Sequence, residues 1–261
     1  MPLAYYSVAA GETFWTEHWG DHTVDELLDV ARASPLTPLI TRALPRDGLV
    51  LEAGCGLGQY VLLLRELGWR VAGADWSVEA LAACRRFAPA PLAAMELRSL
   101  ALRDGALAAY VSLGVAEHDP AGPDAILAEA RRVLGPGGVL ILSVPYLNGL
   151  RRIAAPYIAA RNRAIQRGGG QFYQYAFSRG EVVAALGRHG FRTRWLAPYD
   201  PARLLRRLLP VAAPPRLSGG RREPVPRRRA PWLRAAVHSV LYAPPVLRLL
   251  GHMLLAVAVR R

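Results

Sequence analysis

Residues 50–60 read VLEAGCGLGQY, and this stretch decides the fold of the 261-residue chain. A short apolar strand ends in an acidic residue, glycines follow at a spacing of two, and a helix begins behind them. Glycine suits such a turn because the backbone adopts unusual angles there and because a ligand must approach the main chain closely. A dinucleotide fingerprint would need glycine at position 59, where Gln59 stands, so a pyrophosphate-binding turn is disfavoured.

Strands and helices alternate regularly on both sides of this turn. Strands are expected over 49–52, 69–74, 91–97, 107–113, 139–144, 191–197 and 252–259. Helices are expected over 58–67, over about 78–87 behind a cap at Ser77, and over 124–134, where Gly135-Pro136-Gly137-Gly138 would end the helix. Two further helices are expected to begin at the capping boxes Thr23/Glu26 and Ser178/Glu181. This alternation predicts an α/β fold with a doubly wound, mostly parallel, Rossmann-like seven-stranded sheet that has helices on both faces.

The chain divides into four expected segments. Residues 1–45 are predicted to form a helical cap, and residues 46–200 the Rossmann-like core. Residues 201–250 interrupt the alternation with nine prolines and with 11 arginines against one glutamate, and are read as an insertion. Residues 251–261 are expected to return as the last strand of the core.

The net charge of +13 is unevenly distributed. Residues 1–150 hold 11 arginines against 17 acidic residues, whereas residues 151–261 hold 22 against three. The basic character therefore belongs to the second half, which weakens any reading of the whole protein as a nucleic-acid coat. All 33 basic residues are arginine, a bias typical of a genome rich in G and C.

Composition excludes several other classes. With 52% hydrophobic and 20% charged residues, the chain can build a packed core. Cys55 and Cys84 give neither a disulfide framework nor metal-ligand spacing, so no metal is expected. The N-terminus lacks the pattern of a signal peptide, and prolines, an arginine and a histidine interrupt the apolar stretch near the C-terminus. A cytoplasmic protein is the expectation.

The pattern Glu52-x-Gly54-x-Gly56-x-Gly58 resembles motif I of the class I S-adenosylmethionine-dependent methyltransferases. Three later stretches, SLGVAEH (112–118), EARRVLGPGG (129–138) and SVPYLN (143–148), resemble the E-H, R-V-L-x-P-G-G and V-P-Y-x-N motifs of bacterial and archaeal small-molecule-type members. Residues 14–19 also resemble the N-terminal segment of that group. The resemblance covers roughly residues 1–200 and the last strand, and it is weakest over 201–250.

This resemblance implies a site for S-adenosylmethionine. Asp75 would bind the two ribose hydroxyls, Trp76 would lie against the adenine ring, and Glu96 is the best match for the contact with the adenine amino group. The implied cofactor-binding residues are Glu52, Gly54, Gly56, Gly58, Asp75, Trp76, Glu96, Leu97 and Leu113. One departure is that Leu107-Ala108 stands where the family usually has Phe-Asp.

The candidate catalytic residues are His118 and Tyr146, which follow the fourth and fifth strands at the crevice where such sheets bind ligands. Glu117, Tyr173 and Tyr175 are further candidates for the base. The alternative for Glu117-His118 is that the pair only starts the next helix and supports the loop. The candidate substrate residues are Trp15, Trp19, Asn148, Tyr173 and Tyr175. Residues 171–175 would form either an acceptor lid or a hydrophobic strap, and the two tryptophans either a lid or a helix contact.

The expected function is methyl transfer by in-line displacement to a small-molecule or lipid- or sugar-linked acceptor. One alternative is an RNA methyltransferase that uses the basic second half, although aromatic residues are not interleaved with the arginines of 221–229. Another is a non-catalytic membrane-surface or partner-binding protein. Amphipathic pieces at 203–209 and 232–241 motivate peripheral contact of 201–250 with the inner face of the membrane. The plainer reading is that this insertion packs its leucines on the domain and leaves its arginines in solvent.

Overall fold

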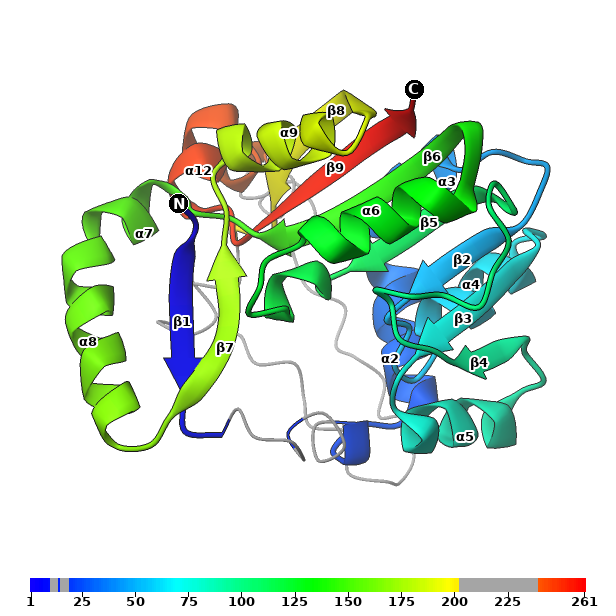
Figure 1. Ribbon diagram of the computed structural model, residues 1–261, viewed down its shortest axis with the longest axis horizontal. Helices are drawn as coiled ribbons and strands as arrows, with labels where there is room; N and C mark the ends of the chain where they lie inside the picture. Colours follow the sequence, from blue (N-terminus) through cyan, green and yellow to red (C-terminus); the bar gives the residue numbers. More distant parts are fainter. Residues whose placement is uncertain (10–13, 15–18, 202–238) are drawn as a thin grey trace, which may run out of the picture.

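The computed structural model describes residues 1–9, 14, 19–201 and 239–261 (Figure 1). Its main sheet has the order β4-β3-β2-β5-β6-β9-β8. Strand β9 is antiparallel to β6 and β8, and the other neighbours are parallel. The strands are β2 (Val50–Ala53), β3 (Val71–Asp75), β4 (Leu92–Ala94), β5 (Leu107–Leu113), β6 (Leu134–Pro145), β8 (Phe191–Tyr199) and β9 (Met253–Arg260). The predicted doubly wound, mostly parallel sheet of seven strands is confirmed.

Helices cover both faces of this sheet, each with its own apolar core. On one face lie α2 (Val24–Ala33), α3 (Leu36–Ala43), α4 (Gln59–Glu66) and α5 (Val78–Phe87), and on the other α6 (Asp124–Val133) and α9 (Arg179–Arg188). The capping boxes predicted at Thr23 and Ser178 are both present and start α2 and α9. They satisfy N–H groups that the first turn of a helix leaves without partners.

The glycine-rich tetrapeptide 135–138 behaves differently from the prediction. Helix α6 does end just before it, at Val133, but β6 begins at Leu134 and includes the tetrapeptide. Leu134 pairs with Leu107, and regular pairing resumes only at Val139 opposite Ala109. The tetrapeptide therefore forms an irregularity inside the strand, which glycine tolerates because it has no Cβ.

A second, two-stranded sheet pairs β1 (Leu3–Ser7) antiparallel with β7 (Gln171–Ala176). Figure 1 shows this sheet beyond the carboxyl ends of the main strands, flanked by α7 (Gly149–Ile153) and α8 (Ala155–Arg167). The prediction of a purely helical cap over 1–45 was therefore wrong for its first residues. A strand that pairs with residues as distant as 171–176 gives little local signal.

Most of the predicted insertion 201–250 lies outside the described residues. The amphipathic piece 203–209 falls there entirely, as does 232–241 up to residue 238. The described part of the segment ends in α12 (Pro244–Leu250). Within the described ranges, no helix has the length and apolar character needed to cross a bilayer.

The topology creates a crevice at the carboxyl ends of β2 and β5. The chain runs outward from β2 through β3 to β4, then crosses back to place β5 on the other side of β2. The connections that leave β2 and β5 therefore turn to opposite sides, and ligands of doubly wound sheets bind at this switch point. Gly54 follows β2 there, and Gly114 follows β5.

Candidate functional site

The glycine turn after β2 needs glycine for both its backbone conformation and its packing. Gly54, Gly56 and Gly58 have φ angles of +78°, +51° and +74°. A Cβ on Gly54 would lie 2.4 Å from a methyl group of Val115, and one on Gly56 would lie 2.4 Å from the ring of Trp19. Both contacts are far shorter than packed atoms allow, so the turn leaves no room for side chains.

Asp75 connects the end of β3 to this turn. Its Oδ2 accepts a hydrogen bond from the Gly56 N–H at 2.7 Å, and its Oδ1 accepts one from the Ser77 N–H at 2.9 Å. Burial raises the pKa of the carboxyl group, and the N–H groups of Ser77, Gly56 and Trp76 oppose that rise. Since each carboxylate oxygen can accept more than one hydrogen bond, Asp75 can still receive two hydroxyl groups from a ligand.

A cavity of about 290 Å³ opens beside the turn, and we call it the glycine-turn cavity. Of the residues that the family resemblance implied, those that line it are Glu52, Gly54, Asp75, Trp76, Leu97 and Leu113. Residues that the sequence analysis did not assign to this site also line it, namely Gln59, Tyr60, Gly114 and Val115. Gln59 opens α4 directly after the last glycine, a position that could have indicated its role.

Glu96 is placed differently from its expected role at the adenine ring. It is absent from the lining of the glycine-turn cavity, and its Oε2 lies 3.0 Å from Nη2 of Arg98. The neighbouring Leu97 turns inward and is 8% exposed. The apolar side chain therefore contributes to the wall, while the carboxylate pairs with an arginine at the surface.

Two polar atoms of the glycine-turn cavity are buried without a hydrogen-bond partner in the described part of the chain, Oε2 of Glu52 and Oε1 of Gln59. Burial raises the pKa of Glu52 to about 8, opposed by the N–H of Val61 and supported by the charge of Asp75. A ligand that brings a hydrogen-bond donor or a positive charge would satisfy both oxygens. S-Adenosylmethionine fits this set, because its amino group, ribose hydroxyls and adenine ring match Glu52, Asp75 and Trp76.

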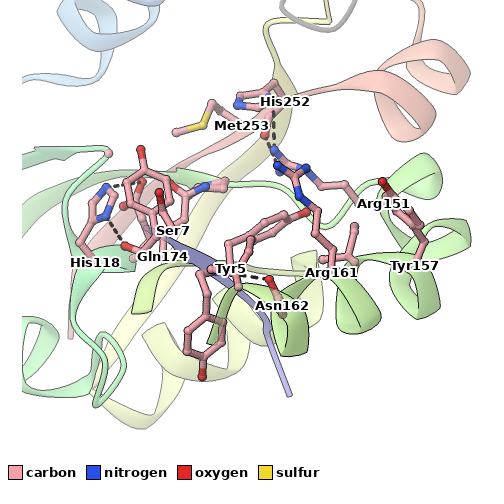
Figure 2. Close-up of a pocket in the computed structure, with 17 residues that line it drawn as sticks. Tyr5, Ser7, His118, Arg151, Tyr157, Arg161, Asn162, Gln174, His252 and Met253 are labelled. Carbon is pink, nitrogen blue, oxygen red and sulfur yellow. Dashed lines mark hydrogen bonds and ion pairs between the residues drawn. The ribbon is translucent and has the colours of Figure 1, made fainter. Parts of the chain in front are cut away.

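A second cavity of about 530 Å³ lies between the main sheet and the small sheet (Figure 2). We call it the β7 cavity, since Tyr173 and Gln174 of β7 form part of its wall, together with residues of β1 and α8. Gly114 and His118 line both cavities. The two spaces therefore meet at the carboxyl end of β5.

His118 is held in a defined orientation where the cavities meet. It belongs to a single turn of 3-10 helix, η1 (Ala116–His118), and its Nδ1 lies 2.7 Å from the carbonyl oxygen of Tyr173. Because a carbonyl only accepts, Nδ1 carries the proton, and the neutral ring then has its lone pair on Nε2. The two readings of Glu117-His118 thus coexist, since the pair forms a short helix and also faces both cavities.

Glu117 lies beside the imidazole. Its Oε1 is 4.0 Å from Nε2 of His118, and its side chain is only 2% exposed. Oε2 is buried, with no hydrogen-bond partner among the residues that the structure describes. Burial raises the pKa of Glu117 to about 8, which makes the group a neutral carboxylic acid at pH 7. It lines the β7 cavity and can there donate a hydrogen bond.

The remaining predicted residues either line a cavity, or pack or hydrogen-bond elsewhere, or lie outside the described residues. Tyr173 lines the β7 cavity and Trp19 the glycine-turn cavity, whereas Trp15 lies outside the described residues. Tyr146 packs in the apolar core, and the hydroxyl of Tyr175 donates to the carbonyl of Pro120. Asn148 caps α7, with its Oδ1 accepting from the N–H of Arg151 and its Nδ2 donating to the carbonyl of Gly251.

Residues 51–142 match the family model described as a methyltransferase domain. A probable S-adenosylmethionine-dependent methyltransferase from Mycolicibacterium smegmatis is 36% identical over 110 residues, which cover 41% of this chain and 41% of that protein. The chain thus aligns with less than half the length of this curated relative.

Solved structures share the fold over most of the chain. An S-adenosylmethionine-dependent methyltransferase from Methanosarcina mazei superposes with a TM-score of 0.60 at 18% identity, over 85% of this chain and 97% of that chain. A geranyl diphosphate C-methyltransferase from Streptomyces coelicolor, in complex with Mg²⁺, geranyl diphosphate and S-adenosyl-L-homocysteine, gives 0.59 at 16% identity, over 97% and 84%. Residues 51–142 thus match a methyltransferase domain, and the solved structures share the fold of the chain.

Proposed function

We propose that this protein is an S-adenosylmethionine-dependent methyltransferase whose cofactor binds in the glycine-turn cavity and whose acceptor is a small molecule that binds in the β7 cavity. The observation that carries the proposal is that both cavities are lined by Gly114 and His118. A methyl donor in one cavity and an acceptor in the other would meet there. Methyl transfer depends on alignment of the two reactants, and adjoining cavities supply that alignment.

In the glycine-turn cavity, each residue has a separate task. The carboxylate of Asp75 receives the ribose hydroxyls, Glu52 and Gln59 receive the amino group, and the ring of Trp76 covers the adenine. Neither Gly54 nor Gly56 could carry a side chain without a clash. When bound, S-adenosylmethionine supplies a methyl group on a positively charged sulfur.

In the β7 cavity, His118 is the general base. When the accepting atom carries a proton, the new bond to the methyl group forms as Nε2 of His118 takes that proton. The carbonyl of Tyr173 holds the ring through Nδ1 and stabilises the imidazolium that results. Glu117, kept neutral by burial, positions the acceptor by donating a hydrogen bond to it.

A small-molecule acceptor is favoured by the size of the β7 cavity, about 530 Å³, which suits a compact organic ligand. A lipid- or sugar-linked acceptor would place only its head in this space. An RNA acceptor and a non-catalytic membrane-surface role remain as alternatives. The segment 201–250, which motivated the membrane contact, lies mostly outside the described residues.

The cofactor assignment is tested by titrating S-adenosylhomocysteine into the protein by calorimetry. Asp75→Ala removes two charge-assisted hydrogen bonds to the ribose, so we expect the affinity to fall on the order of 100-fold. Asp104→Asn is the control for the loss of an acidic residue, because Asp104 is exposed and precedes β5 at the amino end of that strand, whereas the cavity lies at the carboxyl ends. Unchanged affinity in Asp75→Ala would refute the assignment.

The acceptor class is tested by a methyl-transfer assay with radiolabelled S-adenosylmethionine on separated RNA, lipid and small-molecule fractions of a cell extract. We expect label in the small-molecule fraction and no label with Asp75→Ala. Label confined to RNA or lipid would select one of the alternatives instead.

A further inference from the structure

The β7 cavity is chemically different at its two ends. Figure 2 shows His118 at one side and Arg151 and Arg161 at the other, with His252 above them. Glu117 is the one acidic residue among the described residues that line the cavity, and it lies next to His118. Burial raises its pKa to about 8, so the described lining of the cavity carries a net positive charge at neutral pH.

Arg151 is fixed in place by backbone oxygens and by an imidazole. Its Nη1 donates to the carbonyl of Tyr146 at 2.6 Å and to that of His252 at 3.2 Å. Its Nη2 lies 3.1 Å from Nδ1 of His252, and since a guanidinium only donates, that Nδ1 accepts. Hydrogen bonds to these neutral groups orient the cation. The neutral His252 carries its proton on Nε2 and is a second donor.

Arg161 reaches the same end from α8. The adjacent Asn162 bonds twice to β1, with its Oδ1 accepting from the N–H of Tyr6 and its Nδ2 donating to the carbonyl of Ala4. These bonds fix the rotation of α8 against β1, so that Arg161 lines the cavity. No carboxylate in the described part of the chain forms an ion pair with Arg161.

Besides these charged groups, the wall combines polar side chains such as Ser7, Asn162 and Gln174 with aromatic and aliphatic ones. The side chains that contribute to it include Tyr5, Ile158, Ile165, Tyr173 and Met253. A ligand that matches this lining has an apolar or aromatic body and a negatively charged group at one end. Two converging arginines favour an oxyanion, because guanidinium groups bind carboxylates and phosphates through paired hydrogen bonds.

We propose that the basic end of the β7 cavity is a binding subsite for the carboxylate or phosphate group of a small, largely apolar acceptor, which is anchored there with its methyl-accepting atom beside His118. This inference rests on the proposed function for the identity of the ligand as an acceptor. The subsite itself, as a place that binds organic anions, can be measured separately.

The test uses three probes of similar size: 4-hydroxybenzoate, phenyl phosphate and the uncharged 4-hydroxybenzamide. Each is titrated into the full chain by ligand-observed NMR, with and without S-adenosylhomocysteine. We expect at least one of the two anions to bind about tenfold or more tightly than the amide, since a hydrogen bond to a charged group contributes about 1.5–3 kcal/mol. Whichever anion binds identifies the oxyanion that the subsite prefers.

Matched variants locate the subsite. Arg161→Gln is expected to weaken anion binding about tenfold or more and to leave amide binding unchanged, whereas Arg161→Lys keeps the charge and retains part of the affinity. Arg163→Gln is the control, because Arg163 is an exposed arginine of α8 that does not line the cavity. Circular dichroism of each variant verifies that the fold is intact.

Two outcomes would overturn the subsite. In the first, the anions and the amide bind with equal affinity. In the second, Arg161→Gln and Arg163→Gln change the anion affinity equally, which indicates general attraction to a basic surface. The failure of the proposed function is a different result. In that case S-adenosylhomocysteine does not bind, but the anion titration in the absence of S-adenosylhomocysteine still measures binding at the subsite.

Discussion

Nδ1 of His118 lies 2.7 Å from the carbonyl oxygen of Tyr173, which joins η1 of the main domain to β7 of the small sheet. The small sheet thereby has two roles, because it forms a wall of the β7 cavity and also orients the imidazole that faces both cavities. An imidazole held through Nδ1 presents Nε2 as the basic nitrogen.

The first prediction tests this imidazole. In His118→Asn, the side-chain amide can still donate to the carbonyl of Tyr173, but the basic nitrogen is lost. We expect methyl transfer to fall by about 10²- to 10⁴-fold when the accepting atom carries a proton, with S-adenosylhomocysteine affinity within about threefold of the original. Single-turnover measurements with labelled cofactor separate these effects. Full activity in His118→Asn would mean that the residue only supports the loop.

The second prediction concerns stability and pH at Glu117, whose pKa rises from an ordinary value of 4.5 to about 8 in the folded protein. Between these values the folded state keeps a proton that the unfolded chain has released. The free energy of unfolding therefore decreases as the pH rises through this window and levels off above it. Glu117→Gln is always neutral, so we expect it to gain stability relative to the original protein, by on the order of 2 kcal/mol at pH 8.5.

Urea unfolding at pH 5 and pH 8.5 measures this difference. Glu26→Gln is a control for the loss of one acidic residue, because Glu26 is a half-buried member of a capping box and glutamine can replace it there. A Glu117→Gln variant whose advantage does not grow with pH would contradict the buried, protonated carboxyl.

The third prediction concerns the glycine turn. Gly58 has a φ of +74°, and a Cβ there would lie 2.6 Å from Sγ of Cys84. Gly68 also has a positive φ, of +93°, but nothing lies within 4 Å of its Cβ position. We expect Gly68→Ala to cost about 1 kcal/mol through its backbone alone, and Gly58→Ala to cost about 1–3 kcal/mol more through the clash.

A double-mutant cycle assigns the extra cost to its cause. If Sγ of Cys84 is the obstacle, then Cys84→Ala should reduce the penalty of Gly58→Ala toward that of Gly68→Ala. Urea denaturation of the four proteins of the cycle supplies the energies. If the losses in the free energy of unfolding from Gly58→Ala and Cys84→Ala simply add, the clash is relieved in a way that does not involve Cys84.

The parts of the structure that the sequence predicted well are those specified by neighbouring residues. A capping box needs only Thr23 and Glu26, and the glycine turn needs only a strand, its glycines and the helix behind them. The mostly parallel sheet with helices on both faces follows from the alternation, because short right-handed crossovers leave few arrangements of strands and helices. The glycine-turn cavity was predictable for the same reason, since its lining comes largely from the ends of successive strands.

The β7 cavity was less predictable because distant segments form it. The strand over residues 3–7 pairs with residues 171–176, and Arg151 is held by His252, 101 positions away. Neither partner shows a local pattern that points to the other. Glu96 illustrates the limit of motif matching, since the acidic residue is at the expected position but its carboxylate pairs with Arg98 at the surface.

The fourth prediction concerns the ring that the proposed function places against adenine. Trp76 lines the glycine-turn cavity and yet is 56% exposed, so its removal should leave the core intact. Stacking of a base on an aromatic ring contributes about 1–3 kcal/mol, and we expect Trp76→Ala to weaken S-adenosylhomocysteine binding at least about fivefold.

Trp195→Ala provides the matched control for the loss of a half-exposed tryptophan. Trp195 is 40% exposed on β8, at the far side of the sheet order from β3, and it does not line the glycine-turn cavity. Calorimetry should give the original affinity for this variant and a reduced one for Trp76→Ala. Trp76→Phe, which keeps an aromatic face, should recover most of the binding. If the variants with alanine and phenylalanine at position 76 bind equally well, the adenine does not lie against this ring, and that part of the proposed function is wrong.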